Sequence, residues 1–208
     1  MTPPPRTPLR ALALTSTLGL AALALGAGAG AWGAAWITGR GERLNQIEKD
    51  GWTGSLSVGS PHADPWTRAV TAQVGLMALD RREAVYFHRY RDETGRPLDE
   101  RCAYEISGGD LPARWWSITL YAADEFLARN DDGAPSIDAT GVSRDADGRW
   151  RARAAPTRQG AADWLSSRDA GAFSLAIRLY NPEDAAVADV RNIAFPAVRR
   201  IGCEGEDA

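Results

Sequence analysis

The sequence predicts a mainly β fold: an antiparallel β-sandwich or jelly-roll-like domain with one main α-helix, preceded by one N-terminal transmembrane helix. Three observations predict it. Residues 11–38 form a run of 28 residues without a charged side chain, residues 65–80 show helical spacing, and most of the remaining chain alternates apolar and polar residues between turns. With 208 residues, the chain has room for one folded domain after the apolar run, and we do not expect two.

The apolar run is longer than a secretory signal needs. Arg6 and Arg10 precede it, as basic residues precede both signal peptides and signal anchors. A cleaved signal typically has about 7–15 apolar residues, whereas about 20 residues of helix cross a bilayer. Trp32 and Trp36 lie near its far end, where indole rings favour the membrane interface. We therefore expect residues 1–10 to be a short basic N-terminus and the run to be a signal anchor in contact with membrane lipid.

A transmembrane helix at residues 11–38 would export the domain that follows it. A very short basic N-terminus ahead of the only hydrophobic segment is the usual arrangement for insertion with the N-terminus inside, although Arg40, Arg43 and Lys49 balance its charge on the other side. We expect a single-pass protein of the bacterial inner membrane with its domain on the periplasmic side. The alternative is cleavage by a signal peptidase, for example near the Ala-Gly-Ala sequence of residues 27–29.

A connector and a helix follow the membrane segment. Residues 39–63 contain Gly, Ser and mixed charges, which indicates a juxtamembrane connector, and we place the β-sandwich domain at residues 64–208. Asp64 and Pro65 favour a helix start, because Asp accepts free amide hydrogen bonds as an N-cap and Pro suits the first helical position. The apolar residues that follow have helical spacing and predict one helix over residues 65–80: Val70, Val74, Met77 and Ala78.

Two strands separated by a turn come next. Residues 85–90 and residues 101–107 alternate apolar and polar side chains, as half-buried strands do. The intervening residues 92–97 have the composition of a turn, with Asp, Gly and Pro. We expect the two strands to pair as a hairpin.

The strand pattern continues to the C-terminal part of the chain. Residues 114–121 are rich in aromatic and β-branched residues and predict a third strand, while residues 173–180 show the clearest alternation in the chain. Three shorter elements are expected between them: one or two helical turns over residues 122–129, a strand over residues 136–139, and a hairpin within residues 142–154.

Aromatic and polar residues alternate together on three of the predicted strands. They are Tyr86, His88 and Tyr90; Trp115, Ser117, Thr119 and Tyr121; and Ser174, Arg178 and Tyr180. Each group must share one face of its strand, and the groups converge if the strands pair in compatible register. Rings offer flat apolar area while hydroxyls and Arg donate hydrogen bonds, which suits carbohydrate or another hydroxyl-rich ligand.

This pattern yields a set of candidate ligand-binding residues. They are Tyr86, His88, Arg114, Trp115, Ser117, Tyr121, Arg178 and Tyr180. The simpler alternative is an outer sheet face covered by loops or a helix, on which the guanidinium of Arg178 only binds backbone carbonyls. The register of the strands decides whether the candidates meet at all.

Motifs for metal or nucleophilic chemistry are weak throughout the sequence. His62 and His88 are the only histidines, so a three-histidine metal site is impossible. Two acidic turn sequences, residues 130–133 and 145–148, are followed by alanine where a calcium loop needs its bidentate Glu. Residues 55–59 approach a nucleophile elbow but have Ser where Gly is required. We assign no catalytic residue, no metal and no cofactor.

Cys102 and Cys203 are the only cysteines of the chain. Exported domains with two cysteines commonly pair them, so we expect a disulfide between Cys102 and Cys203. A reactive thiol, a metal ligand and two unpaired buried thiols are the alternatives.

The charge balance bears on possible partners. Residues 41–208 hold 21 basic and 27 acidic side chains, a net charge of −6. Nucleic-acid-binding surfaces usually carry a basic excess, so we expect no nucleic-acid partner.

One segment, Leu-Pro-Ala-Arg-Trp-Trp-Ser-Ile-Thr-Leu-Tyr at residues 111–121, fits a fairly specific family pattern. Four further segments fit the same pattern: residues 64–69, 83–87, 92–104 and 172–182. Over most of residues 52–203 the chain thus resembles the bacterial family known as domain of unknown function 1214. The resemblance implies a β-sandwich module that often forms the C-terminal half of longer proteins, and this chain would be a single-domain, membrane-anchored form. It implies no catalytic residues.

Two functions remain as hypotheses. The leading one is a membrane-anchored envelope protein whose periplasmic domain is a non-catalytic module that binds a glycan or cell-wall-like ligand, or a protein partner. The alternative is a periplasmic hydrolase with an active site in the sandwich loops, where Asp110, Arg114 and His88 would supply a carboxylate and an imidazole for proton exchange. Clustering of those three residues would favour the hydrolase.

Overall fold

The computed structural model describes residues 9–41, 46–73 and 79–205. The chain divides into two units, residues 1–44 and residues 45–208. The first unit contains helix α1 (Leu9–Gly41), and the second contains all the strands.

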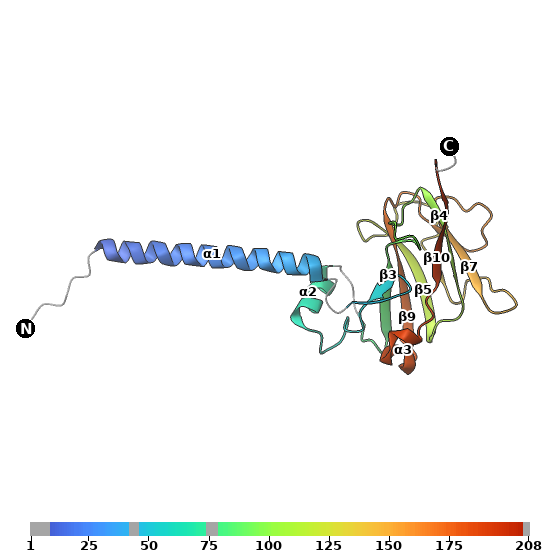
Figure 1. Cartoon of the computed structure of the whole chain (residues 1–208), viewed down its shortest axis with the longest axis horizontal. Coiled ribbons are helices and arrows are strands. Elements are labelled where there is room, and N and C mark those ends of the chain that lie inside the picture. Colours follow the sequence, from blue (N-terminus) through green and yellow to red (C-terminus); the bar gives the residue numbers. More distant parts are fainter. Residues whose placement is uncertain (1–8, 42–45, 74–78, 206–208) are drawn as a thin grey trace, which may run out of the picture. The chain divides into compact units, whose positions relative to one another are not determined.

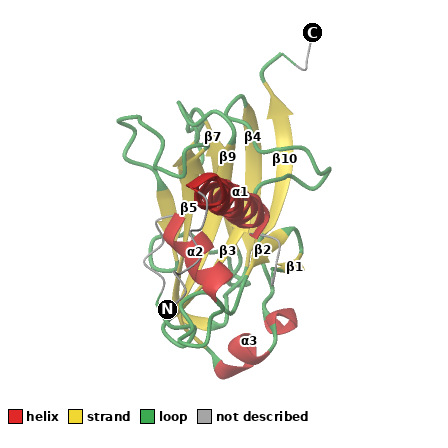
Figure 2. Cartoon of the chain, turned by 90° about the vertical axis from the view of Figure 1, so that its left-hand side faces the viewer, coloured by secondary structure: helices red, strands yellow, loops and turns green. Residues whose placement is uncertain are grey.

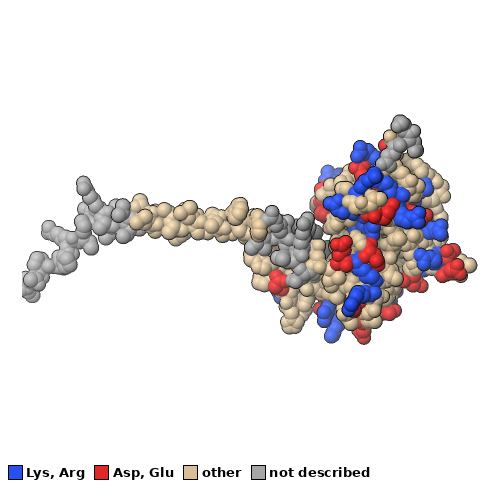
Figure 3. All heavy atoms as spheres, in the orientation of Figure 1, with Lys and Arg blue, Asp and Glu red and all other residues tan. Residues whose placement is uncertain are grey.

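Helix α1 is long and apolar enough to cross a membrane. It has 33 residues, and its segment Ser16–Trp36 has a mean hydropathy of 1.5. Apolar side chains stand exposed along it, with Leu25 74% and Trp32 71% exposed. Residues 16–36 of α1 contain no Lys, Arg, Asp or Glu, and the part of the helix drawn in tan in Figure 3 shows no charged side chain. The apolar N-terminal helix expected from the sequence is therefore present, with the length and composition of a membrane anchor or a signal peptide.

The described part of the second unit consists of ten strands and three short helical segments. Its elements are β1 (Ile47–Lys49), β2 (Trp52–Gly54), α2 (Pro65–Gln73), β3 (Ala84–Arg89), β4 (Cys102–Gly108), β5 (Ala113–Ala122), β6 (Ser136–Asp138), β7 (Trp150–Ala155), β8 (Trp164–Ser166), β9 (Phe173–Pro182), α3 (Asp184–Ala188), η1 (Val190–Asn192) and β10 (Ala197–Cys203).

The strands form two sheets (Figure 1). The larger has the order β1-β2-β3-β9-β5-β6, and the smaller has the order β10-β4-β7-β8. All pairs are antiparallel except β7 with β8, which is parallel. The short helix α3, which follows β9, lies at one end of the strands (Figure 2). The mainly β fold with few helices is confirmed, and the smaller sheet is mixed instead of fully antiparallel.

Aromatic pairs join the two sheets across the core. Trp116 of β5 stacks on Trp150 of β7 with ring centroids 4.9 Å apart. Tyr104 of β4 meets Phe173 of β9 edge-on at 5.7 Å. These four side chains are at most 4% exposed. The indole Nε1 of Trp150 donates to the Gly109 carbonyl at 2.8 Å, so the burial of this ring leaves its N–H paired.

The expected strands at residues 85–90 and 101–107 exist as β3 and β4, but the hairpin expected between them is wrong. β3 pairs with β2 and β9, whereas β4 pairs with β7 and β10 in the other sheet. The turn at residues 92–97 is real, because Arg91 bridges to Pro97. Both strands carry a buried apolar row. In opposite sheets both rows face the one core between the sheets, which buries more apolar area than a hairpin with both rows on one face.

Residues 122–126 form a tight turn, where helical turns were expected over residues 122–129. The backbone N–H of Ala122 donates to Phe126 O at 2.8 Å, and that of Glu125 donates to Ala122 O at 2.9 Å. Glu125 has a φ of 62°, in the left-handed region, which interrupts a right-handed helix. The composition of the segment does not reveal this conformation, since the residue at positive φ is not a glycine.

Two other short elements are present where the sequence predicts them. The strand expected at residues 136–139 is β6. In the hairpin expected within residues 142–154, Arg144 bridges to Trp150, and Gly148 N donates to Asp145 O at 3.0 Å.

Helix α2 begins where the sequence predicts. The carboxylate Oδ1 of Asp64 accepts hydrogen bonds from the backbone N–H groups of Trp66 at 2.9 Å and Thr67 at 3.1 Å. These bonds satisfy amides that have no partner within the first turn. The described helix ends at Gln73, and residues 74–78, which include three of the apolar residues used for the prediction, lie outside the described residues.

The larger sheet starts inside the segment that the sequence assigned to a connector, residues 39–63. Strands β1 and β2 extend this sheet next to β3. Trp52 is fully buried, and its Nε1 donates to the Pro196 carbonyl at 2.8 Å. Strands of three residues are too short to show alternation, so one buried tryptophan is their main sequence signal.

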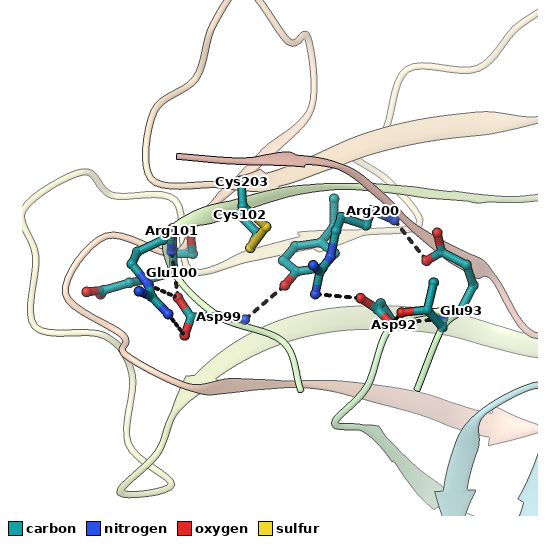
Figure 4. Close-up of a disulfide and its surroundings, with 11 residues drawn as sticks. Asp92, Glu93, Asp99, Glu100, Arg101, Cys102, Arg200 and Cys203 are labelled. Carbon is teal, nitrogen blue, oxygen red and sulfur yellow. Dashed lines mark hydrogen bonds and ion pairs between the residues drawn. A yellow bond between two sulfur atoms is a disulfide. The ribbon is translucent and has the colours of Figure 1, made fainter. Parts of the chain in front are cut away.

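A disulfide ties the strand β10 to its neighbour (Figure 4). Cys203 of β10 is bonded to Cys102 of β4, from which it is separated by 101 positions in sequence. The two residues are also partners in the strand register. The bond therefore closes a long loop at the edge of the smaller sheet.

A buried ion pair lies beside the disulfide. Arg200 Nη2 of β10 is 2.8 Å from Asp92 Oδ2, and the Asp92 side chain is fully buried. Burial acts to raise the pKa of Asp92, but hydrogen bonds from Thr94 and Arg96 and the charge of Arg200 outweigh it, so this pKa lies below its usual value. Asp92 is therefore ionised, and β10 carries the cation that compensates it (Figure 4).

Reduction of the disulfide is expected to lower the free energy of unfolding. A loop of about 100 residues contributes up to about 4.7 kcal/mol in the chain-entropy model. Urea unfolding with and without reductant measures this loss, and non-reduced peptide mapping of protein isolated from the envelope should show the linked peptides. The double variant Cys102→Ser, Cys203→Ser is the control and should not respond to reductant. Quantitative alkylation of both cysteines without reductant would contradict the bond.

Candidate functional site

The larger sheet has one buried apolar face and one face of aromatic and polar side chains. Along β9, Leu175, Ile177 and Leu179 are fully buried toward the smaller sheet. The alternate residues Arg178 and Tyr180 are half-buried and point to the opposite side. The same division holds on β3 and β5, because both pair with β9 in antiparallel register.

Strand register brings most of the candidate residues onto this second face. Arg178 of β9 is opposite Tyr86 of β3 and Ser117 of β5. Tyr180 is opposite Trp115. The next row contains His88, Ala176 and Thr119, and the row beyond it contains Ser174 and Tyr121. We call this surface the outer face and define it by Tyr86, His88, Trp115, Ser117, Thr119, Tyr121, Arg178 and Tyr180.

Arg178 lies at the centre of the outer face and binds hydroxyl groups. Its Nη1 donates to Thr119 Oγ1 at 3.0 Å, and its Nη2 donates to the Tyr121 hydroxyl. The guanidinium carbon is also 5.4 Å from the Tyr121 ring centroid, within cation–π range. Among the described residues, no carboxylate pairs with Arg178. The expected alternative, in which Arg178 binds carbonyls, is not what these contacts show.

His88 is neutral at physiological pH. Burial of its ring, and secondarily the positive charge of Arg178, lower the pKa of His88 from 6.5 to about 4. The ring stacks on Tyr90 with centroids 5.9 Å apart. Its Nδ1 is buried and has no hydrogen-bond partner among the described residues. The outer face therefore contains an unused polar atom beside a cation.

An aromatic pair occupies one end of the outer face, away from Tyr121. The rings of Trp115 and Tyr180 are 5.3 Å apart. Trp115 is 36% exposed, and its Nε1 donates to Thr140 Oγ1 at 3.1 Å. This hydrogen bond fixes the indole, so that solvent-accessible ring surface remains at a defined place.

A small cavity adjoins the outer face at the Tyr121 end. It has a volume of about 210 Å3 and is lined by ten residues that include Tyr90, Glu125 and Ser174. The Ser174 hydroxyl is buried without a hydrogen-bond partner among the described residues. Sequence reasoning missed this cavity, because the positive φ of Glu125 in the 122–126 turn leaves no compositional signal.

Arg114 and Asp110 do not join the outer face. Arg114 precedes Trp115 in a regular strand, so its side chain starts on the other side of β5. Asp110 lies in the loop between β4 and β5 and pairs with Arg144 at 2.8 Å. Asp110 thus has an ion-pair partner outside the outer face, and Arg114 and His88 start on opposite sides of the larger sheet.

Within the described residues, no group of three His, Cys, Asp or Glu side chains could hold a metal ion. The chemistry available on the outer face is therefore that of rings, hydroxyls, one guanidinium and one neutral imidazole.

Comparisons with known proteins identify a family and a fold. The family described as "Protein of unknown function (DUF1214)" matches residues 83–184, from the start of β3 to the start of α3. The VPA0106 protein from Vibrio parahaemolyticus has a similar solved structure, with a TM-score of 0.56 and 22% identity over 68% of this chain and 36% of that chain. A second, uncharacterised protein from Burkholderia cenocepacia has a TM-score of 0.45 and 17% identity over 57% and 29% of the two chains.

These comparisons bear on architecture and leave activity open. The family expected from the sequence is confirmed over the matched residues. The match to the Vibrio protein covers about a third of that protein's length, and its identity is low enough to report on the fold alone. No curated protein matches the chain.

His88 is expected to make stability depend on pH. Its folded pKa of about 4 lies below the value of 6.5 for the free side chain, so between these values the unfolded chain binds a proton that the folded protein does not. The free energy of unfolding should be highest above pH 6.5 and fall toward pH 4, by up to roughly 3 kcal/mol.

Urea unfolding at pH 7 and pH 4.5 measures this decrease. The variant His88→Gln should show a smaller decrease than the wild type, because it removes the titrating ring. His62→Gln, which changes the only other histidine, is the matched control and should behave like the wild type. An equal decrease in the wild type and His88→Gln contradicts the assignment.

Proposed function

We propose that this chain, whose residues 83–184 match the DUF1214 family, is a membrane-anchored protein of the bacterial envelope that binds a glycan or cell-wall-like ligand on the outer face of its periplasmic domain. A protein partner on the same face is the second form of this proposal. The module acts by binding and not by catalysis.

Two features support an envelope location. The exposed apolar helix α1 has the length of a membrane span. The Cys102–Cys203 disulfide belongs to the unit that follows this helix, and disulfides persist in oxidising compartments such as the periplasm. Retention of the helix as an anchor and insertion with the N-terminus inside together give a periplasmic domain.

The convergence of the outer-face side chains carries the binding proposal. Strands β5 and β9 align Trp115 with Tyr180 and Ser117 with Arg178, and β3 adds Tyr86 opposite Arg178. Rings give flat apolar area for a sugar, and hydroxyls and a guanidinium give directional hydrogen bonds to its polar groups. Fixed rotamers reduce the entropy lost on binding, and both Trp115 and Arg178 are held by side-chain hydrogen bonds.

Binding is better supported than hydrolysis because the residues required for proton exchange are separated. Asp110 is compensated by Arg144, and its side chain is 82% exposed. His88 is on β3 with no carboxylate among its described partners. A general acid and base pair must both reach one substrate atom, and these two groups are held in different surroundings.

The location is testable by membrane extraction and protease treatment. Full-length protein should remain in the membrane after washing with alkaline carbonate, because the apolar helix spans the bilayer. Protease added to intact spheroplasts should degrade the domain, since the domain would face outward. Release by carbonate without prior cleavage, or complete protection from protease, contradicts the proposed placement.

The binding surface is testable with ring deletions. Trp115→Ala and Tyr180→Ala are expected to weaken binding of soluble peptidoglycan fragments to the full-length protein in detergent at least about tenfold, equivalent to about 1.4 kcal/mol. Calorimetric titration measures the affinity, and circular dichroism measures folding. Ile201→Ala, which removes a 53% exposed apolar side chain of β10, is the control and should bind normally. Unchanged affinity in both ring variants contradicts a ligand site on the outer face.

A further inference from the structure

The surroundings of Arg178 point to the charge of the ligand. An arginine is always protonated in proteins, and its guanidinium has five N–H donors. Two hydrogen bonds from Arg178 are seen, to Thr119 and Tyr121, and both acceptors are neutral. The nearest acid in the same rows, Asp138, is opposite Ser117 and accepts from the backbone of the following turn. A half-buried cation thus has donors left and no compensating carboxylate among the described residues.

A second polar group next to Arg178 also lacks a partner. His88 is the diagonal neighbour of Arg178 across the β3–β9 pair, because Tyr86 is opposite Arg178 and His88 is opposite Ala176. His88 Nδ1 is buried and unpaired, and so is the Ser174 hydroxyl one row further along. Buried polar atoms are normally hydrogen-bonded, so atoms without partners around one cation indicate a place for a ligand group.

The outward residue of β9 next to Arg178 is Ala176, which is 2% exposed because larger side chains cover it. Ala176 stands between His88 and Thr119 in the register, and Arg178 occupies the following outward position of the strand. The hydrogen bonds of Arg178 to Thr119 and Tyr121 direct its guanidinium toward this row. Arg178 itself is half-buried, so an anionic group can reach its guanidinium from the solvent side of this row.

The distance to the aromatic pair sets the size of the ligand. Trp115 and Thr119 are four residues apart on β5, which corresponds to about 13 Å along the strand. A ligand that covers the Trp115–Tyr180 rings and also reaches the Ala176 row must be longer than one sugar. The rings favour an apolar sugar face, and the guanidinium favours a carboxylate, whose two oxygens match its fork of N–H groups.

We propose that Arg178 binds the carboxylate of an acidic oligosaccharide whose neighbouring sugar lies on Trp115 and Tyr180. This inference rests on the proposed function, because it names the ligand class of the outer face. It assigns His88 and Tyr121 as groups that line the carboxylate subsite.

The test compares two forms of one probe. Peptidoglycan glycan strands freed of stem peptides by an amidase carry carboxylates on their sugars, and coupling with ammonia converts these carboxylates to neutral amides. The full-length protein in detergent should bind the carboxylate form at least tenfold more tightly than the amide form. Arg178→Gln should reduce this ratio to about one, while Arg199→Gln, on the outer side of the smaller sheet, should leave it unchanged.

The outcomes separate the inference from the function on which it rests. Equal binding of both forms by the wild type, or preference only for fragments that retain stem peptides, overturns the role of Arg178 and leaves a glycan-binding outer face intact. Binding of none of these peptidoglycan probes overturns both proposals.

A second measurement needs no variant that might disturb folding. The His88 ring of the wild type can be titrated by NMR in the free protein and in the complex. Carboxylate strands should raise the pKa of His88 above about 4, because the bound anion offsets the charge of Arg178, and amide strands should not. An unchanged His88 titration in saturated complex overturns the inference.

Discussion

Strand β9 is paired on both sides along most of its length, and this double pairing organises the domain. Its inward residues Leu175, Ile177 and Leu179 fill the core, while its outward residue Arg178 is placed between β3 and β5. A slip of one residue would exchange these two sets and expose three apolar side chains. Burial of the apolar residues therefore fixes the register of β9, and this register fixes where the outer-face residues lie.

The aromatic pairs of the core explain how short strands form a stable two-sheet domain. Trp116 with Trp150 and Tyr104 with Phe173 each join residues of opposite sheets. Such rings bury large apolar areas and prefer defined geometries. The disulfide adds a covalent constraint at the β10 edge of the smaller sheet, and its Cys102 is on β4, the strand that also contains Tyr104. The aromatic pairs therefore join the two sheets, whereas the disulfide joins neighbouring strands within one sheet.

Alternation in the sequence was sufficient to predict β3, β4, β5 and β9 and to group the side chains of the outer face, because side-chain direction follows from strand period alone. Pairing partners were not predictable in this way: the wrong hairpin of β3 with β4 arose because local alternation does not say which sheet a strand joins. Arg114 is a different case, because alternation alone already places it on the other side of the strand from Trp115. The strands β1 and β2 were missed because three residues carry no periodicity.

The placement of Arg200 on β10 has a consequence for the order in which the two sheets can be completed during synthesis. Asp92 is synthesised more than a hundred residues before the guanidinium that compensates it, and β4 likewise precedes its partner strand. An emerging chain that has reached β9 can complete the larger sheet, but the smaller sheet still lacks an edge and its nascent core contains an uncompensated carboxylate. Final assembly therefore waits for the last strand. A chain that ends before β10 therefore lacks the edge strand, the cation that compensates Asp92 and one cysteine of the disulfide.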